Sequence, residues 1–503
     1  MNDKRDPNRI TRRDFLQQAG VGAAGTLIMM SESRLFAEPT SGEEASLLKD
    51  ITSQPQGDLD RFLASQEPYF REFAKTFLLD PKTTYLAAGQ KGSQPIPILR
   101  RFKEGLDQIA KDPFPVYLEP SEKTRGKIAR SYGATVDEIA ISRNATDALS
   151  MILHGISWQN GDELLTSTME YPNCVATLLR VAGRYGVKIR QFGVPINHSA
   201  TADEVVASIR RQIRPGKTKV LFFSCPIQPT GIMLPAIRIA RLAQEYNIIT
   251  VADGAHYGGQ FVPKLAEIGI DFWGISGHKW QCGPGGTGIL YVRNRAHPAN
   301  STPLPKFFLV RSGDLEAPTD GSRPAGFDIG AALSLYGFPE SADWRALGEV
   351  CELWDAIGRK RIEQYILALG EYARRRFIHV FGKDALLQPL YDPELKSGII
   401  AFNPFPKPEQ RRNVKNNTEF RDRMFKEYGF HVGGEGLGPK GLTRFPDPEA
   451  RAFPIGCIPN RDSITNHPSP TDYPMRINAC LWNHRGQIDQ FVASCHELVK
   501  KMI

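Results

Sequence analysis

The segment Ile275-Ser276-Gly277-His278-Lys279-Trp280 decides the fold, because it places a lysine directly after the end of an apolar, strand-like run. An earlier apolar run, Ile248 to Ala252, ends in the same way in Asp253 and is followed by His256. Polar side chains that follow parallel strands gather at the carboxyl edge of the sheet, where such sheets bind ligands. An acid, a histidine and a lysine in this order predict a site for pyridoxal phosphate (PLP).

The chemistry of PLP explains why these two residue types are needed together. PLP draws electrons from the α-carbon of a substrate into a protonated ring, so a buried carboxylate must keep the ring nitrogen charged and an amine must anchor the aldehyde. Asp253 and Lys279 are the candidates, and Lys279 is nucleophilic if the pocket is dry. Taken singly, such a lysine is more often a solvated turn residue and such an aspartate a helix cap.

Further motifs favour the functional interpretation. The strand-like run 138–142 leads into Asn144-Ala145-Thr146 and then into an apolar helical pattern. The N-terminus of such a helix offers free N–H groups to a phosphate, to which Ser276 and His278 can also donate. Tyr171 follows another apolar run and can stack on the pyridine ring. Each motif alone would be an ordinary helix cap or core residue, and only their combination indicates a site.

The order of these motifs resembles the class V aminotransferase superfamily of fold-type I PLP enzymes. The forms Arg143-Asn144-Ala145-Thr146-Asp147-Ala148-Leu149 and Gly277-His278-Lys279-Trp280 look closest to the isopenicillin N epimerase-like branch. The likeness covers roughly residues 80–300 and a C-terminal stretch. It implies an α/β fold in which a mostly parallel, seven-stranded-type sheet lies between helices, with a smaller α+β C-terminal domain. It also implies a homodimer.

The resemblance implies a role for each matching residue. Lys279 would be the Schiff-base lysine, Asp253 would hold the ring nitrogen, and Tyr171 would stack on the ring. The residues beside the ring's O3′ would be His256 and Gln228. The residues that hold the phosphate and neighbouring ring atoms would be Asn144, Ala145, Thr146, Ser276 and His278.

Arg476, in the run Pro474-Met475-Arg476-Ile477-Asn478, matches the family arginine that takes the α-carboxylate of an amino substrate. A rigid guanidinium fork suits a carboxylate. The alternative is an arginine at a strand start with its head in water.

Two departures from the family pattern affect the expected reaction. A desulfurase needs a reactive cysteine shortly before that arginine, whereas Cys457 lies nineteen positions upstream in another context, which disfavours sulfur transfer from cysteine. Pro284-Gly285-Gly286 and Gly337-Phe338 stand where relatives carry threonines. The phosphate contact between subunits therefore stays open, and backbone N–H groups of Gly285 or Gly286 can substitute.

The N-terminus carries the second strong signal. Arg9 to Leu16 contains paired arginines followed by Phe-Leu, and a run of 12 weakly apolar residues, Ala19 to Met30, comes next. This pattern predicts a twin-arginine export signal with cleavage after Ala37, so we expect a periplasmic or secreted enzyme that carries its PLP through the export machinery. The apolar run is too short for a stable membrane anchor. An amphipathic helix is the alternative.

Composition sets broad limits on partners. The chain has 503 residues, 41% of them apolar, which is enough for more than one domain. Its net charge of +8 comes from scattered basic residues without a nucleic-acid motif, so we expect no nucleic-acid partner. The seven cysteines show no C-x-x-C spacing, so neither a metal site nor a disulfide framework is predicted.

The pattern of elements predicts the domain organisation. Apolar strands alternate with helical patterns up to about residue 300, which indicates a mostly parallel sheet. Helical stretches from Trp344 to Val380 follow, and then an irregular segment, Pro404 to Pro470, which holds Gly433-Gly434-Glu435-Gly436 and Arg444 and could cover the site. The predicted units are a signal peptide (1–37), a linker (38–60), a PLP-binding large domain (61–335) and a small domain (336–503).

These features predict an enzyme in which Lys279 removes the α-proton of an amino substrate. Return of the proton to the other face gives epimerisation, its return to the cofactor gives transamination, and loss of a β-substituent gives a lyase. An epimerase or aminotransferase is preferred over a lyase or a cysteine desulfurase-like enzyme. A non-catalytic exported binding protein is a further alternative, against which the intact Lys279, Asp253 and Arg476 argue.

Overall fold

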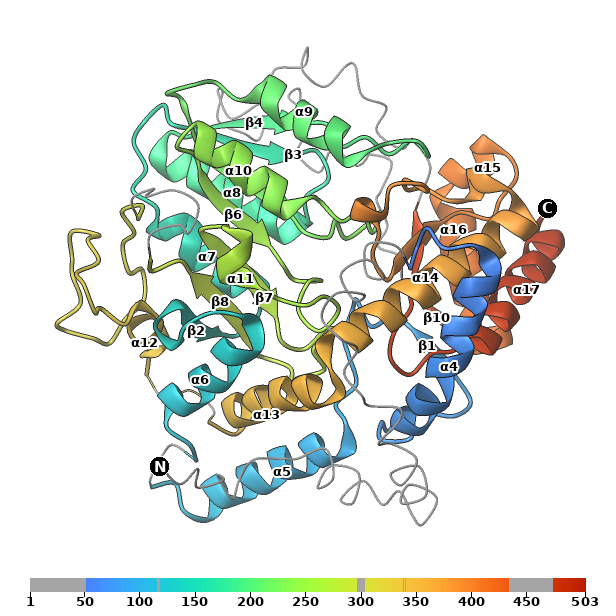
Figure 1. The fold of residues 1–503 in the computed structure, drawn as a ribbon, viewed down its shortest axis with the longest axis horizontal. Helices are drawn as coiled ribbons and strands as arrows, with labels where there is room; N and C mark the ends of the chain where they lie inside the picture. The colour runs from blue at the N-terminus through green and yellow to red at the C-terminus, as the bar shows by residue number, and fades with distance from the viewer. Residues whose placement is uncertain (1–50, 115–117, 296–303, 338, 340, 434–473) are drawn as a thin grey trace.

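The structure is a computed structural model and describes residues 51–114, 118–295, 304–337, 339, 341–433 and 474–503. The predicted signal peptide, Cys457 and Arg444 lie outside these residues. The described chain forms a larger α/β unit and a smaller α+β unit (Figure 1). Helices α13 (Ser341–Ile357) and α14 (Arg359–Phe381) run from the first unit to the second.

A seven-stranded sheet forms the centre of the larger unit. Its strands run parallel except β8, which is antiparallel to both neighbours, so the predicted fold class is confirmed. In spatial order the strands are β2 (Ile139–Ser142), β8 (Gly288–Val292), β7 (Phe272–Ser276), β6 (Ile249–Asp253), β5 (Thr218–Ser224), β3 (Glu163–Ser167) and β4 (Lys188–Phe192).

Helices cover both faces of this sheet because its strands are apolar on both sides. Within β5, Val220 and Phe222 join the cluster that holds α7 and α8, whereas Leu221 and Phe223 join the cluster on the opposite face. All four are fully buried. The helices of this unit are α5 (Ile96–Lys111), α6 (Ser121–Tyr132), α7 (Ala145–Gly155), α8 (Pro172–Tyr185), α9 (Ala202–Gln212), α10 (Ala236–Glu245), α11 (Leu265–Ile268) and α12 (Ile329–Ser334).

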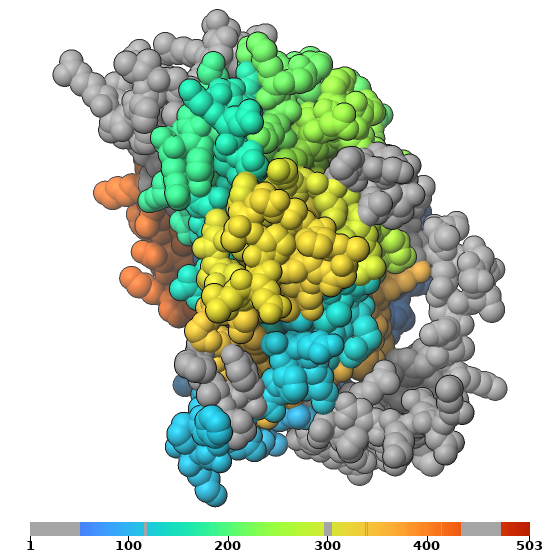
Figure 2. Space-filling model, turned by 90° about the vertical axis from the view of Figure 1, so that its left-hand side faces the viewer, coloured from blue at the N-terminus to red at the C-terminus, as the bar shows by residue number. Residues whose placement is uncertain are grey.

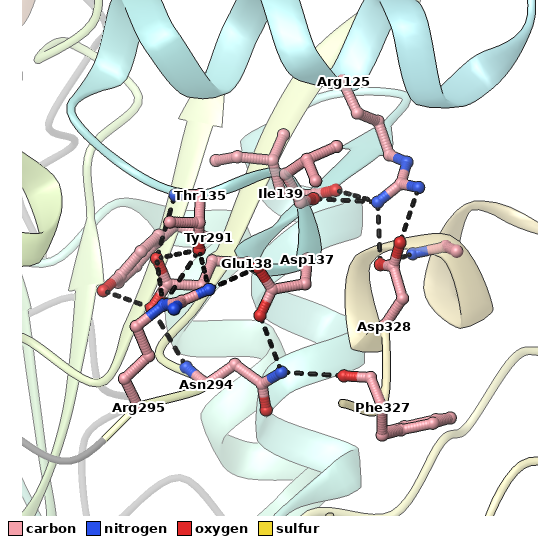
Figure 3. A network of polar contacts seen from close by, with 12 residues as sticks. Arg125, Thr135, Asp137, Glu138, Ile139, Tyr291, Asn294, Arg295, Phe327 and Asp328 are labelled. Carbon is pink, nitrogen blue, oxygen red and sulfur yellow. Dashed lines mark hydrogen bonds and ion pairs between the residues drawn. The ribbon is translucent and has the colours of Figure 1, made fainter. Parts of the chain in front are cut away.

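An ionic network fixes the edge strand β2 to its surroundings (Figure 3). Arg125 of α6 donates two hydrogen bonds, of 2.8 and 2.9 Å, to Asp328, which caps α12. Asn294, just beyond β8, donates to Asp137 at 2.9 Å. Residues 304–337 lie next to this edge and are drawn in yellow at the centre of the face that Figure 2 shows.

The smaller unit combines two short strand pairs with helices. Strand β1 (Thr84–Leu86) pairs in parallel with β10 (Phe430–Val432), and β9 (Ile399–Phe402) pairs antiparallel with β11 (Met475–Asn478). The helices of this unit are α4 (Gln56–Ala74), α14, α15 (Pro408–Arg412), α16 (Val414–Tyr428) and α17 (Arg485–Met502). No helix within the described residues is both long and apolar enough to cross a membrane.

The structure differs from the expected domain boundaries in its N-terminal segment. Helix α4 begins at Gln56, inside the predicted linker, and it packs on α14, where Phe70 stacks on Tyr365 at 3.9 Å. Since β1 also pairs with β10, residues 56–86 join the small unit rather than the large one. The pairing joins residues more than 340 positions apart in the sequence, which no local pattern reveals.

The segment from Pro404 onward is less irregular than expected. It contains α15, α16 and β10 in its described part, which runs to Gly433. Helix α16 forms because Asn417, Phe420 and Met424 recur at helical spacing and are fully buried. Charged residues between them hide this stripe in the sequence.

Candidate active site

The predicted catalytic side chains meet at the carboxyl edge of the sheet. Asp253 is the last residue of β6, and Lys279 follows the end of β7 by three residues. The Nζ of Lys279 lies 3.3 Å from the Nε2 of His256 and 5.8 Å from the centre of the Tyr171 ring. These residues line one cavity of about 730 Å³, which we call the main cavity.

The main cavity brings together ten of the eleven predicted site residues. They are Asn144, Ala145, Thr146, Tyr171, Gln228, Asp253, His256, Ser276, His278 and Lys279.

His256 is held as a neutral ring that points its proton at the lysine. The indole N–H of Trp280, which can only donate, lies 3.2 Å from Nδ1 of His256. Burial, and then the positive charges of Lys279 and Arg476, lower the pKa of His256 well below its usual value. A neutral ring that accepts at Nδ1 carries its proton on Nε2, so His256 can donate to the Lys279 nitrogen whenever that nitrogen is unprotonated.

Asp253 is a buried carboxylate with weak partners. Its Oδ1 accepts the backbone N–H of Ala255 at 2.9 Å, and its Oδ2 accepts the thiol of Cys174 at 3.1 Å. Burial raises the pKa of Asp253, although the Ala255 N–H and the charge of Lys279 act in the opposite direction. A cation placed in the main cavity beside Asp253 would restore its charged form, which is what a protonated ring nitrogen provides.

A second buried carboxyl, Glu170, lies next to this group. It follows β3 and accepts the hydroxyls of Ser167 and Ser224, each at 2.5 Å. Ser224 is the register partner of Asp253 on the neighbouring strand. Burial raises the pKa of Glu170 to about 7, despite the lowering effect of the two serine hydroxyls.

Another part of the main cavity is built from a helix N-terminus. Asn144 caps α7, and its side chain accepts the N–H of Asp147 at 2.9 Å. The first-turn N–H groups of Ala145 and Thr146 have no partner within the helix and are available to an anion. His278 adds a buried Nδ1 that has no hydrogen-bond partner among the described residues. Burial, followed by the charge of Lys279, lowers the pKa of His278.

These donors fit PLP. The Lys279 amine can react with the aldehyde, and the buried Asp253 carboxylate can pair with the ring nitrogen. Tyr171, near that amine, can stack on the pyridine face. The helix N-terminus and the unpartnered His278 nitrogen supply a place for the phosphate.

Arg476 is the one predicted site residue that does not line the main cavity. It is buried on β11, and its Nη1 donates to the backbone carbonyl of Gln228 at 2.7 Å. Gln228 itself lines the main cavity, so the guanidinium lies directly beside it. The predicted alternative, an arginine with its head in water, is wrong because only 3% of Arg476 is exposed.

The N-terminal segment forms a contact with the site that the sequence did not predict. The N–H of Gly92 donates to the carbonyl of His278 at 2.8 Å, and a Cβ on Gly92 would lie 2.0 Å from the carbonyl oxygen of Lys279. The N–H of Gly89 donates to the Asn478 side chain at 2.8 Å. Glycine is therefore required at position 92 by the close approach of two backbones.

Sequence signals exist for some of the missed residues. Gly89 and Gly92 flank two polar residues after a short apolar run, which marks a close backbone approach. Asn478 stands two positions after Arg476, so the two share one face of β11. Glu170 directly precedes Tyr171, whereas Cys174 carries no signal that separates it from an ordinary core cysteine.

Comparisons with known proteins identify relatives of this chain. The model of the family described as aminotransferase class-V matches residues 118–403. The chain is 29% identical over 330 residues to the isopenicillin N epimerase of Amycolatopsis lactamdurans, which covers 64% of this chain and 82% of that protein. It is 27% identical over 246 residues to the hercynylcysteine sulfoxide lyase of Schizosaccharomyces pombe, covering 47% of this chain and 60% of the lyase.

Solved structures share the fold at lower identity. The cystine C-S lyase C-DES superposes with a TM-score of 0.62 at 19% identity and covers 83% of this chain and 98% of its own. The apo cysteine desulfurase of Thermococcus onnurineus NA1 gives a TM-score of 0.61 at 17% identity, covering 86% and 98% of the two chains.

Proposed function

The chain belongs to the aminotransferase class-V family and is a PLP-dependent enzyme, and from this premise we propose that it removes and returns the α-proton of an amino acid or a derivative of one. The observation that carries the proposal is the contact of 3.3 Å between Lys279 and His256 in a cavity that also presents Asp253. It joins a proton carrier, a group that orients it, and a carboxylate for the ring nitrogen.

Each residue has a defined task in this proposal. PLP supplies the electron sink when bound, and Asp253 keeps its ring nitrogen protonated. Lys279 anchors the aldehyde and then, as a free amine, takes the proton from the substrate's α-carbon. The Nε2–H of His256 fixes the direction of the amine. Arg476 orders Gln228 at the wall of the main cavity, beside the space that a substrate carboxylate would enter.

We prefer an epimerase-like reaction, with transamination as the other form of the same proposal. The similarity to isopenicillin N epimerases over most of their length supports this preference. In an epimerase the proton returns to the opposite face of the α-carbon, whereas in an aminotransferase it is delivered to the cofactor.

A carbon–sulfur or β-eliminating lyase is the second candidate, and the similarity to hercynylcysteine sulfoxide lyase favours it. A desulfurase reaction has less support. It requires an accessible nucleophilic thiol, and the six cysteines in the described part of the chain are all buried, so that thiol would have to be Cys457, which lies outside the described residues. Burial raises the pKa of each of these thiols, with Cys174, Cys282 and Cys495 raised furthest above the usual range.

The test begins with the visible spectrum of the purified protein after addition of PLP. A band at roughly 410–430 nm is expected, and Lys279→Ala should abolish it while the matched surface variant Lys264→Ala keeps it. A colourless wild type would refute the catalytic assignment and favour the non-catalytic binding protein.

A panel of L- and D-amino acids in D₂O then separates the reactions. Deuterium at the α-carbon together with the opposite enantiomer identifies an epimerase, and a 2-oxo acid with retained amine on the cofactor identifies an aminotransferase. Pyruvate with a released thiol or sulfenate from a cysteine derivative identifies a lyase. Unchanged substrates and an unshifted band across the panel would contradict α-proton chemistry on amino acids.

We further propose that the protein is exported by the twin-arginine route and is a homodimer. The paired Arg12 and Arg13 motivate the first proposal. The double variant Arg12→Lys, Arg13→Lys preserves charge and should retain the protein in the cytoplasm, with unaltered export arguing against the signal. Light scattering of the mature protein tests the dimer, which a monomeric mass would contradict.

A further inference from the structure

Glu170 is a buried carboxyl that the proposed reaction does not use. Its side chain is within the core, with only 1% of the residue exposed, and it does not line the main cavity. It nevertheless has three hydrogen-bond donors: the hydroxyls of Ser167 and Ser224, and the backbone N–H of Ser224 at 3.3 Å. These three donors favour the ionised carboxylate, because both of its oxygens accept, and they act against the burial that raises its pKa.

The strand register joins Glu170 to the cofactor site. Ser224 ends β5 and pairs with Asp253, which ends β6. The negative charge of Asp253 raises the pKa of Glu170, so the two carboxyls act on each other. Cys174, whose thiol bonds Asp253, is also raised in pKa by the charge of Glu170.

The charged surroundings of Glu170 are therefore defined on each side. Asp253 faces it from β6 and Cys174 from α8, while Lys279 acts on both of these residues from the loop after β7. Its own donors are neutral hydroxyls and an amide. The described residues place no arginine or lysine in a salt bridge with Glu170, so its ionisation adds a full negative charge behind Asp253.

We propose that Glu170 is a positioning residue whose charge, acting through Asp253, raises the affinity of the bound cofactor and of Lys279 for their protons. This inference rests on the proposed function, since it concerns the same cofactor site. Glu170 ionised adds a second anion behind the ring nitrogen and strengthens the electron sink. Glu170 protonated leaves Asp253 as the single anion and weakens it.

The pH titration of the visible band of the PLP-loaded protein tests this proposal. The band shifts to shorter wavelength when the proton between Lys279 and the cofactor is lost, and a nearby anion moves the midpoint to higher pH. Glu170→Gln keeps the shape and removes the charge, so its midpoint should fall by about 0.5–1 pH unit. A matched control is Glu163→Gln, a buried carboxyl at the opposite end of β3, which should keep the wild-type midpoint.

A second variant covers the case in which Glu170→Gln does not fold. Ser167→Ala removes one hydroxyl from Glu170 without touching the main cavity, which favours protonated Glu170. Its midpoint should fall in the same direction by a smaller amount, and Ser167→Thr, which restores a hydroxyl, should return it toward the wild type.

Midpoints of the Glu170 and Ser167 variants equal to that of Glu163→Gln would overturn the positioning role while leaving PLP binding intact. A wild type without a visible band would instead overturn the proposed function and this inference together. A shift of Glu163→Gln as large as that of Glu170→Gln would also overturn the role, because the effect would then be a general one of the fold.

Discussion

An aspartate is buried at each end of strands β6 and β7, and the two aspartates differ in their hydrogen-bond and ion-pair partners. At the amino end, Asp271 accepts the N–H and the hydroxyl of Thr250, both at 2.9 Å, and two nitrogens of Arg293 at 2.8 and 2.6 Å. At the carboxyl end, Asp253 has one backbone N–H and one thiol. The first charge is compensated within the chain. The second lacks a cation in direct contact among the described residues, which indicates a site prepared for a ligand that brings one.

The substitution Asp253→Asn, at the carboxyl end, is expected to give the largest loss of activity. Loss of the carboxylate lets the ring nitrogen lose its proton, so kcat/KM should fall by about 100- to 1000-fold. The cofactor-free protein should unfold within about 1 kcal/mol of the wild type, because the variant removes a poorly compensated charge. Steady-state kinetics and urea unfolding measure the two quantities, and a large loss of stability would place Asp253 with the structural aspartates.

Asp271→Asn should give the reverse result. It leaves the buried Arg293 without its carboxylate, so the free energy of unfolding should fall by about 3–5 kcal/mol. The folded fraction should still develop the visible band with PLP. Loss of the band in folded protein would show that the two ends are not independent.

Glu170 should make the free energy of unfolding depend on pH. Its pKa in the folded protein, about 7, lies above its usual value of 4.5, so the folded state binds the proton more tightly than the unfolded state. Glu170 therefore adds to the free energy of unfolding most below pH 4.5. This contribution, on the order of 3 kcal/mol, is lost as the pH rises toward 7. Urea unfolding of the cofactor-free protein at a series of pH values should show this fall in the wild type and a flatter profile in Glu170→Gln. Parallel profiles would contradict the raised pKa.

Substitution of Cys174 should give the smallest change in kcat/KM. The thiol hydrogen bond lowers the pKa of Asp253, so Cys174→Ala should raise that pKa slightly and Cys174→Ser, with a stronger donor, should lower it. Changes in kcat/KM of a few-fold in opposite directions are expected, with stability changes of about 1 kcal/mol. Equal effects of both substitutions would point to packing rather than to the hydrogen bond.

The contrast between the two ends also separates what the sequence predicts from what it does not. The functional end is visible because Asp253 and Lys279 each follow a continuous apolar run, and such runs mark buried parallel strands. Ten of the eleven predicted site residues line one cavity for this reason. Glu170 and Cys174 were missed because their significance depends on the pairing of β3, β5 and β6 and on the packing of α8.

The small unit was predicted less well because its order comes from distant pairing. In helix α16 the few buried residues are separated by charged residues, so the sequence shows no clear apolar pattern. Strand β1 pairs with β10, which is distant in the sequence. Arg476 was predicted to reach a substrate carboxylate, but its contact with the Gln228 carbonyl depends on where β11 meets the larger unit.

The hydrogen bond between Gly89 and Asn478 spans 389 positions and joins the first strand region of the described chain to its last strand. A chain whose synthesis has stopped before β11 lacks Asn478, so this link between the first strand region and the site can form only after the last strand has been made.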